Sequence, residues 1–336
     1  MFYIIGTGPN TLLDIPLSTI PLLKSSNSIY LEYYTSIISN DELNSSLDFL
    51  QKFINRKIKL ATRKDLESEE TLIKDYMENG SVCLLVPGTP MFATTHFDLL
   101  LRLKEYGIRY KIFHNASIIN VTGSLGLYSY CFGKTVSVPS LQRFISVDRD
   151  SIDIKNVEQF RERPLPFSVI ENINKNFLSG LHCLILCDIR MQDGEVTEET
   201  KKNEIESLKY ENKTIEGAYP SNEAIIRELE ESVSNFDKRS FDLPNMSYVN
   251  NFMTANECIH TLLILSELSG LSTALNMDTV MFVVCRFGTD TEKIYLGTAR
   301  NLLNLNFGAP LHSLVIPGKI DLVEKENLIE MFGYKF

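Results

Sequence analysis

Short apolar runs alternate with helix-like segments through the first third of the chain. Four runs predict strands, at residues 2–5, 28–33, 81–86 and 110–113. Helical patterns separate them, beginning near residue 17 and covering residues 41–54, 62–78 and 94–105. Continuous rather than alternating apolar strands are typical of a parallel sheet that is covered on both faces. The pattern therefore predicts an N-terminal α/β domain over residues 1–120.

The pattern over the remaining residues, 121–336, predicts a second α/β domain. Strands are expected at residues 135–138, 181–189, 280–286, 293–297 and 313–316, and helices at 154–177, 253–268 and 323–331. An acidic, polar insertion interrupts this domain at about residues 190–250. Residues 193–242 hold 14 acidic and 7 basic side chains. Their net charge of −7 accounts for most of the chain's net charge of −10. This composition favours a solvated helical or partly disordered segment, and docking of a partner is the alternative.

Length and composition narrow the class of protein. A chain of 336 residues exceeds what one small core usually holds, which favours two domains. The net negative charge is opposite in sign to the clustered positive charge that is typical of nucleic-acid binders. No apolar run is long and unbroken enough to cross a bilayer. Neither nucleic acid nor a membrane is therefore an expected partner. The six cysteines lack a CxxC pair, the five histidines are scattered, and the N-terminus resembles no signal sequence, so we expect a cytoplasmic protein without a metal site.

The glycine turn after the first predicted strand has two interpretations. Gly6 and Gly8 would let backbone N–H groups approach a ligand, and Glu32 lies where a dinucleotide fold places its ribose acceptor. However, Thr11 occupies the position of the third glycine, and Pro9 has no N–H to donate. A tight strand exit is therefore favoured over nicotinamide binding.

His96 opens the helix that follows the third apolar run. The positive end of a helix dipole disfavours a protonated imidazole at that position. A lone histidine there is more typical of a structural hydrogen bond than of a catalytic base. Residues 114–120 add a further strand end with small polar side chains, and residues 308–316 form a loop that runs into a strand. The residues by themselves thus indicate a two-domain α/β protein whose strand ends suit a polar ligand.

Several motifs, taken in order, carry a resemblance to a known family. Among them are Tyr3–Gly6, Tyr30–Glu32, Ala93–His96, Asn115–Ile118 and Pro310–Leu314. They resemble the diphthine synthases, the methyltransferases of diphthamide biosynthesis, over almost the whole chain except the acidic insertion. The resemblance implies a two-domain α/β, tetrapyrrole-methylase-like (class III) methyltransferase fold with the cofactor cleft between the domains.

The resemblance also implies a reaction. S-adenosyl-L-methionine would be the cofactor, and the substrate would be elongation factor 2, on the histidine that carries a 3-amino-3-carboxypropyl group. Four methylations, giving diphthine methyl ester, are expected of a homodimeric enzyme. The three-methyl archaeal-type diphthine synthase and a non-catalytic relative that binds elongation factor 2 are the alternatives. A methylase of the same fold acting on a tetrapyrrole or on ribosomal RNA is disfavoured, because it does not share these motifs.

Eight cofactor-binding residues follow from the resemblance. Three match the family within its motifs: Ser117, Ile118 and His312. Five align by position but are substituted: Pro9, Thr89, Phe92, Cys187 and Phe287. Thr89 stands where the family has an aspartate and Phe92 where it has a glycine, so the bulk of Phe92 is expected to crowd the cofactor. The sequence identifies neither a general base nor a metal ligand.

Overall fold

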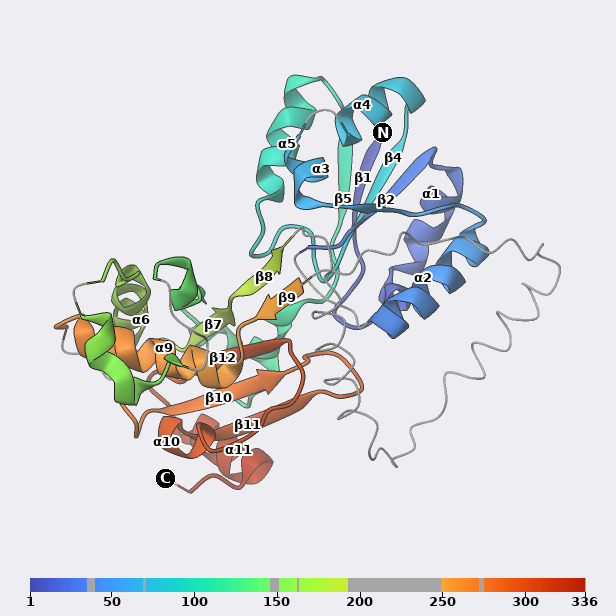
Figure 1. The fold of residues 1–336 in the computed structure, drawn as a ribbon. Coiled ribbons are helices and arrows are strands. Elements are labelled where there is room, and N and C mark those ends of the chain that lie inside the picture. Colours follow the sequence, from blue (N-terminus) through green and yellow to red (C-terminus); the bar gives the residue numbers. More distant parts are fainter. Residues whose placement is uncertain are drawn as a thin grey trace. The chain divides into compact units, whose positions relative to one another are not determined.

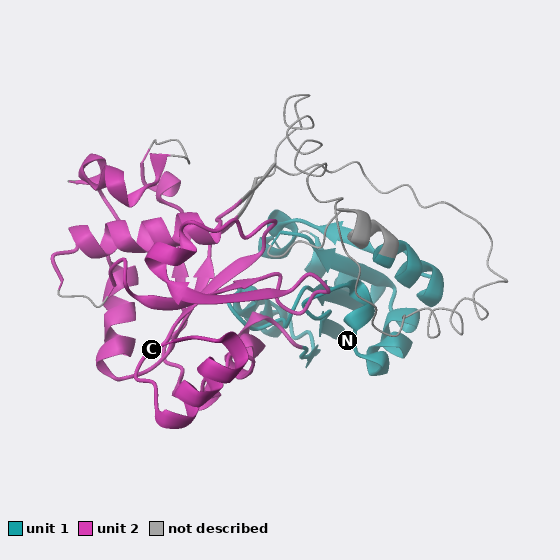
Figure 2. Ribbon diagram, turned by 90° about the horizontal axis from the view of Figure 1, so that it is seen from below, with its two compact units in different colours: residues 1–115, 191–251 teal, residues 116–190, 252–336 magenta. Residues whose placement is uncertain are grey.

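The chain divides into two compact units, which Figure 2 colours separately. Unit 1 comprises Met1–Asn115 and Met191–Asn251, and unit 2 comprises Ala116–Arg190 and Phe252–Phe336. The division falls after Asn115, where the sequence places a boundary at residue 120. The computed structural model describes residues 1–34, 40–68, 71–145, 151–161, 163–192, 249–271 and 275–335. The predicted acidic insertion therefore lies almost entirely outside the described residues.

Unit 1 is built on a five-stranded parallel sheet with the strand order β3-β2-β4-β1-β5 (Figure 1). Its strands are β1 (Phe2–Gly6), β2 (Ser28–Glu32), β3 (Lys59–Ala61), β4 (Val82–Val86) and β5 (Tyr110–Phe113). Its helices are α1 (Ile20–Ser25), α2 (Asn40–Ile54), α3 (Arg63–Glu67), α4 (Leu72–Asn79) and α5 (His96–Glu105), with the 3-10 helices η1 (Leu12–Asp14) and η2 (Leu17–Thr19). Because β1 lies between β4 and β5, the loops that leave these three strands meet at one edge of the sheet.

Apolar side chains fill both faces of this sheet. Ile5, Leu31 and Leu85 face a cluster that includes residues of α1 and α2. The intervening strand residues, such as Ile4 and Leu84, face a second cluster with residues of α3, α4 and α5. Successive side chains of a strand point to opposite faces, so a sheet covered on both sides needs apolar residues at every position. The predicted parallel sheet is thereby confirmed.

Unit 2 contains a mixed five-stranded sheet with the order β11-β10-β12-β7-β6. Its strands are β6 (Val136–Val138), β7 (Cys183–Cys187), β10 (Val280–Cys285), β11 (Lys293–Thr298) and β12 (His312–Ile316). Only β6 and β7 run parallel, and the other neighbours are antiparallel. The helices are α6 (Ser168–Leu178), α9 (Ala255–Leu268), α10 (Ala299–Leu302) and α11 (Leu322–Phe332), with the 3-10 helices η3 (Ile118–Gly123), η4 (Ser129–Cys131), η5 (Leu141–Arg143) and η7 (Ile154–Phe160). Two further strands, β8 (Ile189–Gln192) and β9 (Val249–Phe252), pair with each other, and each contains one of the points at which the chain is divided into units.

One large apolar cluster holds unit 2 together. It joins alternate residues of the sheet, such as Val283 and Leu314, to buried residues of α6 and α9. On the opposite face of the sheet, the ring of Phe282 packs edge-on against Phe332 of α11, with their centroids 5.3 Å apart. The mixed sheet is therefore covered on both sides, as the apolar character of its central strands requires.

Two predicted helices are interrupted in the structure. The segment 62–78 forms α3 and α4 as separate helices, and β3 precedes them although the sequence predicted no strand there. The segment 154–177 forms η7 and then α6. Pro164 and Pro166 lie between these two helices, where a proline removes a backbone donor and disfavours helical geometry in the residue before it. The predicted strands of unit 1 are otherwise confirmed to within one residue at each end.

The six cysteines are unpaired, and all except Cys131 are buried. In the part of the chain that the structure describes, no His, Cys, Asp and Glu side chains gather in groups of three or more that could hold a metal ion. Within the same residues, none of the helices has the length and apolar character needed to traverse a bilayer.

We expect Leu84→Ala to lower the free energy of unfolding of unit 1 by about 2–5 kcal/mol, because it leaves a cavity in a tightly packed core. Leu84 is fully buried in β4, between two covered faces. Leu17→Ala is the matched control, since Leu17 is 83% exposed and should change stability by less than about 0.5 kcal/mol. Urea denaturation followed by circular dichroism measures both, and equal losses would contradict the packing of β4.

Candidate functional site

The loops that leave β1 and β4 are joined through their backbones at the carboxyl edge of the unit 1 sheet. The N–H of Gly8 donates to the carbonyl of Gly88 over 3.1 Å, and the N–H of Gly88 donates back over 2.8 Å. A Cβ atom at Gly6 would lie only 2.6 Å from the Gly88 carbonyl oxygen. Gly8 itself has a φ of +83°, which side chains disfavour. The glycines therefore serve the close approach of two loops, which supports the tight strand exit.

Asn115 attaches the loop after β5 to the same assembly. Its side-chain amide donates to the carbonyls of Gly6 and Asp14, each over 3.0 Å. Its backbone N–H donates to Thr89 Oγ1 over 3.3 Å. Three strand exits are thus held together by hydrogen bonds to one asparagine, which restricts the conformations open to all three loops.

Two of the predicted cofactor residues, Pro9 and Thr89, lie in the loops that the Gly8–Gly88 pair brings together. The Thr89 hydroxyl accepts the Asn115 N–H and lies 3.4 Å from His114 Nδ1. The hydroxyl of Thr89, where the resemblance leads us to expect an aspartate, therefore still holds the loop. Phe92 follows in the same loop and is half-buried, and Ala93 after it has a φ of +53°.

Glu32 is not available as a ribose acceptor. Its side chain is fully buried at the end of β2, and its Oε2 lies 2.8 Å from His96 Nε2. The other ring nitrogen of His96, Nδ1, lies 2.8 Å from the carbonyl oxygen of Pro90. Because Glu32 is buried against His96, it cannot bind a ribose hydroxyl. The structure therefore does not support a dinucleotide site at β1 and β2.

The expectation that the helix end disfavours a protonated His96 does not hold in this environment. Burial lowers the pKa of His96, but the hydrogen bond and charge of Glu32 and the carbonyl of Pro90 together raise it above the ordinary value. The carboxylate lies in direct contact with the ring, so its effect exceeds that of the partial charge at the end of α5. The structural role predicted for His96 is confirmed by its two partners.

Strand register brings three predicted residues of unit 2 to one edge of its sheet. Ser313 of β12 pairs with Leu186 of β7, so His312 and Cys187 lie next to that pair on adjacent strands. His312 also pairs with Cys285, the last residue of β10, and Phe287 follows two residues later. Cys187, His312 and Phe287 thus share one edge, although the sequence places them far apart.

Both ring nitrogens of His312 are bonded to backbone groups. The N–H of Ala255 donates to Nδ1 over 3.1 Å, and Nε2 donates to the carbonyl of Ala309 over 2.9 Å. Burial, together with the charge of Arg286, lowers the pKa of His312 to about 4, against the opposing effect of the Ala309 hydrogen bond. The ring is therefore a neutral connector between α9 and the loop before β12, and it is not placed as a base.

Arg286 has a structural role that its sequence context does not indicate. It has a φ of +49°, and its guanidinium donates to the carbonyls of Thr291 (3.2 Å) and Phe307 (3.1 Å) and to that of Ala309. These contacts secure the chain that leads to His312. Nothing local in the sequence indicates that two of its partners, the carbonyls of Phe307 and Ala309, lie more than twenty residues away.

Ser117 and Ile118 lie at the beginning of unit 2, directly after the division of the chain. The backbone N–H of Ser117 donates to Asn120 Oδ1 over 2.9 Å at the start of η3, and its side chain is buried. They follow Asn115 by two and three residues and so continue the loop that leaves β5.

Comparison with known proteins identifies the family. The family model described as Tetrapyrrole (Corrin/Porphyrin) Methylases matches residues 1–175, which is more than half of the chain. This chain belongs to the tetrapyrrole methylase family. It is a methyltransferase, and the match covers all of unit 1's sheet and the start of unit 2.

Relatives of this methylase match it over nearly its whole length. A diphthine methyl ester synthase of Dictyostelium discoideum is 32% identical over 97% of this chain and 96% of the relative. The diphthine methyl ester synthase of Homo sapiens is 30% identical over 98% of this chain and 94% of the relative. A crystal structure assigned to a diphthine synthase of Entamoeba histolytica has a TM-score of 0.67 and 28% identity, and covers 100% of this chain and 99% of its own. The similarity therefore includes both units.

Gly6→Ala in this methylase should lower the free energy of unfolding by about 1–3 kcal/mol, because the new Cβ would overlap the Gly88 carbonyl oxygen. Gly123→Ala is the control, since a Cβ there meets no atom within 4 Å and the backbone needs no left-handed conformation. Differential scanning calorimetry measures both variants. A Gly6→Ala protein as stable as Gly123→Ala would contradict the close approach of the two loops.

The low pKa of His312 predicts a loss of stability in acid. The folded value of about 4 lies below the ordinary 6.5, so the unfolded chain binds a proton first as the pH falls. The stabilisation is therefore complete above about pH 6.5 and decreases by up to about 3 kcal/mol towards pH 4. We expect His312→Gln to show a smaller loss over this range in parallel urea titrations. Equal losses in the two proteins would show that His312 does not titrate in this way.

Proposed function

We propose that this methyltransferase is a diphthine methyl ester synthase, which methylates the 3-amino-3-carboxypropyl-histidine of elongation factor 2 four times. The observation that carries the proposal is the similarity of about 30% to diphthine methyl ester synthases across both units. The family model alone ends at residue 175 and leaves the edge with Cys187, Phe287 and His312 unassigned. The full-length relatives extend the match through that edge.

We propose S-adenosyl-L-methionine as the methyl donor. The residues at the unit 1 edge fit a polar ligand, since Thr7 Oγ1 is fully buried and has no hydrogen-bond partner within the described ranges. The residues that would hold the cofactor are the eight that the resemblance implies: Pro9, Thr89, Phe92, Ser117, Ile118, Cys187, Phe287 and His312. When bound, this cofactor supplies an activated methyl group on a sulfonium.

The residues of the chain itself contribute rigid positioning. Backbone hydrogen bonds hold the loops of β1 and β4 together, and Asn115 adds the loop of β5. In unit 2 the His312 ring and the Arg286 guanidinium fix the chain before β12. Methyl transfer is an in-line displacement, so alignment and exclusion of water supply most of the acceleration. His312 takes no proton from the substrate amine in this scheme, because both its nitrogens are engaged.

The partners follow from the same proposal. The substrate protein is elongation factor 2, and the enzyme acts in the cytoplasm as a homodimer. Its acidic net charge of −10 supports a protein rather than a nucleic acid as the substrate. Size-exclusion chromatography with light scattering measures the oligomeric state directly.

Mass spectrometry of the modified peptide tests the function. We expect four methyl-mass increments on cognate elongation factor 2 that bears the aminocarboxypropyl histidine, after incubation with S-adenosyl-L-methionine. The same protein with the target histidine unmodified is the control and should gain none. Three increments would indicate the archaeal-type diphthine synthase. An absence of increments, with cofactor and substrate verified, would contradict the enzyme and favour a relative that only binds elongation factor 2.

A further inference from the structure

His96 is buried between two hydrogen-bond acceptors. Its Nδ1 lies 2.8 Å from the carbonyl oxygen of Pro90, and its Nε2 lies 2.8 Å from Oε2 of Glu32. His96 is 2% exposed and Glu32 is 0% exposed, so water does not replace either partner. A neutral imidazole has only one N–H to donate. Both contacts are therefore made only when a further proton lies between His96 and Glu32.

The other buried histidines have a different environment. His182 also lies against a carboxylate, with its Nε2 2.9 Å from Glu324 Oε1. Its Nδ1, however, accepts the backbone N–H of Gly318 over 2.9 Å, so one ring proton satisfies both contacts. His312 likewise meets one donor and one acceptor. Of these three buried rings, His96 is the one whose contacts require the additional proton.

The partner of His96 belongs to the loop that carries two of the proposed cofactor residues. Three consecutive residues of this loop are anchored, each by a different part of unit 1. Gly88 pairs with Gly8, Thr89 accepts the Asn115 N–H, and Pro90 accepts from His96. The first two anchors involve no titratable proton. The third depends on the proton that Glu32 and His96 share.

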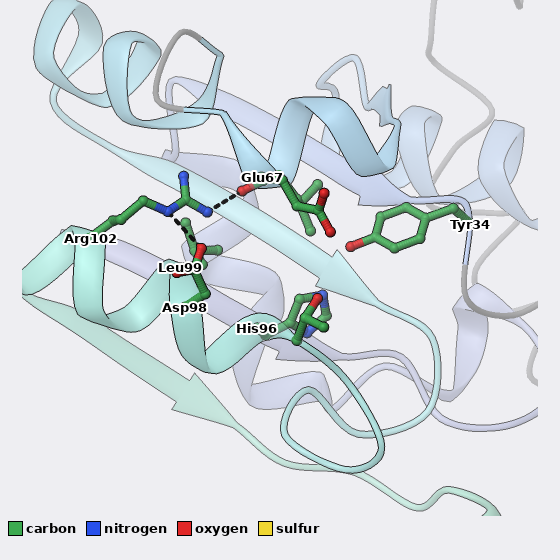
Figure 3. Close-up of a pocket in the computed structure, with 8 residues that line it drawn as sticks. Tyr34, Glu67, His96, Asp98, Leu99 and Arg102 are labelled. Atoms are coloured by element: carbon green, nitrogen blue, oxygen red, sulfur yellow. Dashed lines mark hydrogen bonds and ion pairs between the residues drawn. The ribbon is translucent and has the colours of Figure 1, made fainter. Parts of the chain in front are cut away.

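Charged groups around the ring leave Glu32 as its direct counter-ion. His96 borders a pocket of about 390 Å³ that Tyr34, Glu67, Asp98 and Arg102 also line (Figure 3). Arg102 pairs with Asp98 over 3.0 Å. Glu67 pairs with Arg63 over 2.8 Å, and the loop of residues 87–95 has no charged side chain. Burial, followed by the charge of Glu32, raises the pKa of the Tyr34 hydroxyl, which therefore stays neutral.

We propose that His96 is a positioning residue, which uses the proton shared with Glu32 to hold the Pro90 loop in the conformation that binds the cofactor. This inference rests on the proposed function for the identity of the cofactor. When the shared proton is lost, a ring lone pair faces a buried carboxylate, and at least one of the two contacts breaks. Thr89 directly precedes Pro90 and Phe92 follows it by two residues, so both are held less firmly once this anchor is lost. Cofactor affinity should then fall as the pH rises.

The expected fall in cofactor affinity with rising pH agrees with the direction in which the pKa of His96 is shifted. Burial lowers the pKa of His96, but Glu32 and Pro90 raise it above the ordinary 6.5. The folded state therefore keeps the proton to a higher pH than the unfolded state does. The contribution is complete below pH 6.5 and is lost as the pH rises through the folded pKa.

The variant Glu32→Gln tests whether the shared proton, and not merely the two contacts of the His96 ring, controls cofactor binding. A glutamine amide donates to Nε2 while Nδ1–H still donates to Pro90, so a neutral imidazole satisfies both neighbours. We expect this variant to bind the cofactor as the wild type does at low pH, and to keep that affinity as the pH rises. His96→Leu removes both contacts and should bind weakly at every pH. Glu324→Gln is the matched control, because it alters the His182 pair and leaves the Pro90 loop intact.

Isothermal titration calorimetry with S-adenosyl-L-methionine provides the test. The Kd of the wild type and of Glu324→Gln should rise about tenfold between about pH 6 and about pH 9, the effect of losing one charge-assisted hydrogen bond. The Kd of Glu32→Gln should rise much less. Because the titration of the cofactor itself is common to all variants, the difference between them isolates the pair. A wild type and a Glu32→Gln protein with the same pH dependence would overturn the proposal.

A measurement without cofactor separates this inference from the proposed function. In ¹⁵N spectra of the free protein, His96 should have both ring nitrogens protonated at about pH 6, and its titration should shift the amide of Gly88. A singly protonated His96 with an unmoved Gly88 amide would overturn the role of the pair. If these shifts occur but S-adenosyl-L-methionine binds at no pH, the role of His96 in positioning the Pro90 loop is supported. In that case it is the proposed function that is contradicted.

Discussion

The mutual hydrogen bonds between Gly8 and Gly88 are the constraint on which the unit 1 edge depends. They bring two strand exits to backbone contact, closer than any side chain at Gly6 would allow. The carbonyl of Gly6 then becomes accessible to the Asn115 amide, which attaches the third exit. Because the strands end at the same edge of a parallel sheet, a small set of hydrogen bonds orders all the loops that carry candidate ligand contacts.

This arrangement explains why a substitution at Thr89 is compatible with the fold of the loop. Threonine lacks the charge of the aspartate expected there, but its hydroxyl accepts the Asn115 N–H and so retains an anchor. The neighbouring Pro90 is held separately through His96.

The buried histidines show that burial alone does not determine the chemistry of a side chain. Burial lowers the pKa of His312 and His96 alike. In His312 a backbone donor occupies one nitrogen, so the neutral ring satisfies its surroundings. In His96 both nitrogens face oxygen acceptors, and the carboxylate of Glu32 reverses the effect of burial. The number of donors and acceptors around the ring decides which protonation state the fold stabilises.

The sequence by itself determined the class of fold and most of the strands of unit 1, because the apolar runs of a doubly covered sheet are local patterns. It also located the polar strand ends and, through their resemblance to a family, the chemistry expected there. It did not indicate β3, a strand of three residues with only Ala61 buried, because so short a run has no distinctive period. Pro164 and Pro166 lie at the break between η7 and α6, but the apolar periodicity alone predicted one helix there.

Only the tertiary structure decided which polar groups meet. The pairing of Glu32 with His96 depends on where β2 and α5 lie around the same sheet, and the neutrality of His312 depends on a backbone donor at the start of α9. Strand order and register bring Cys187 next to His312. These contacts join residues that are distant along the chain, so their energies depend on packing and not on local sequence. Local patterns therefore specify the elements, whereas the protonation and placement of the site residues follow from how those elements pack.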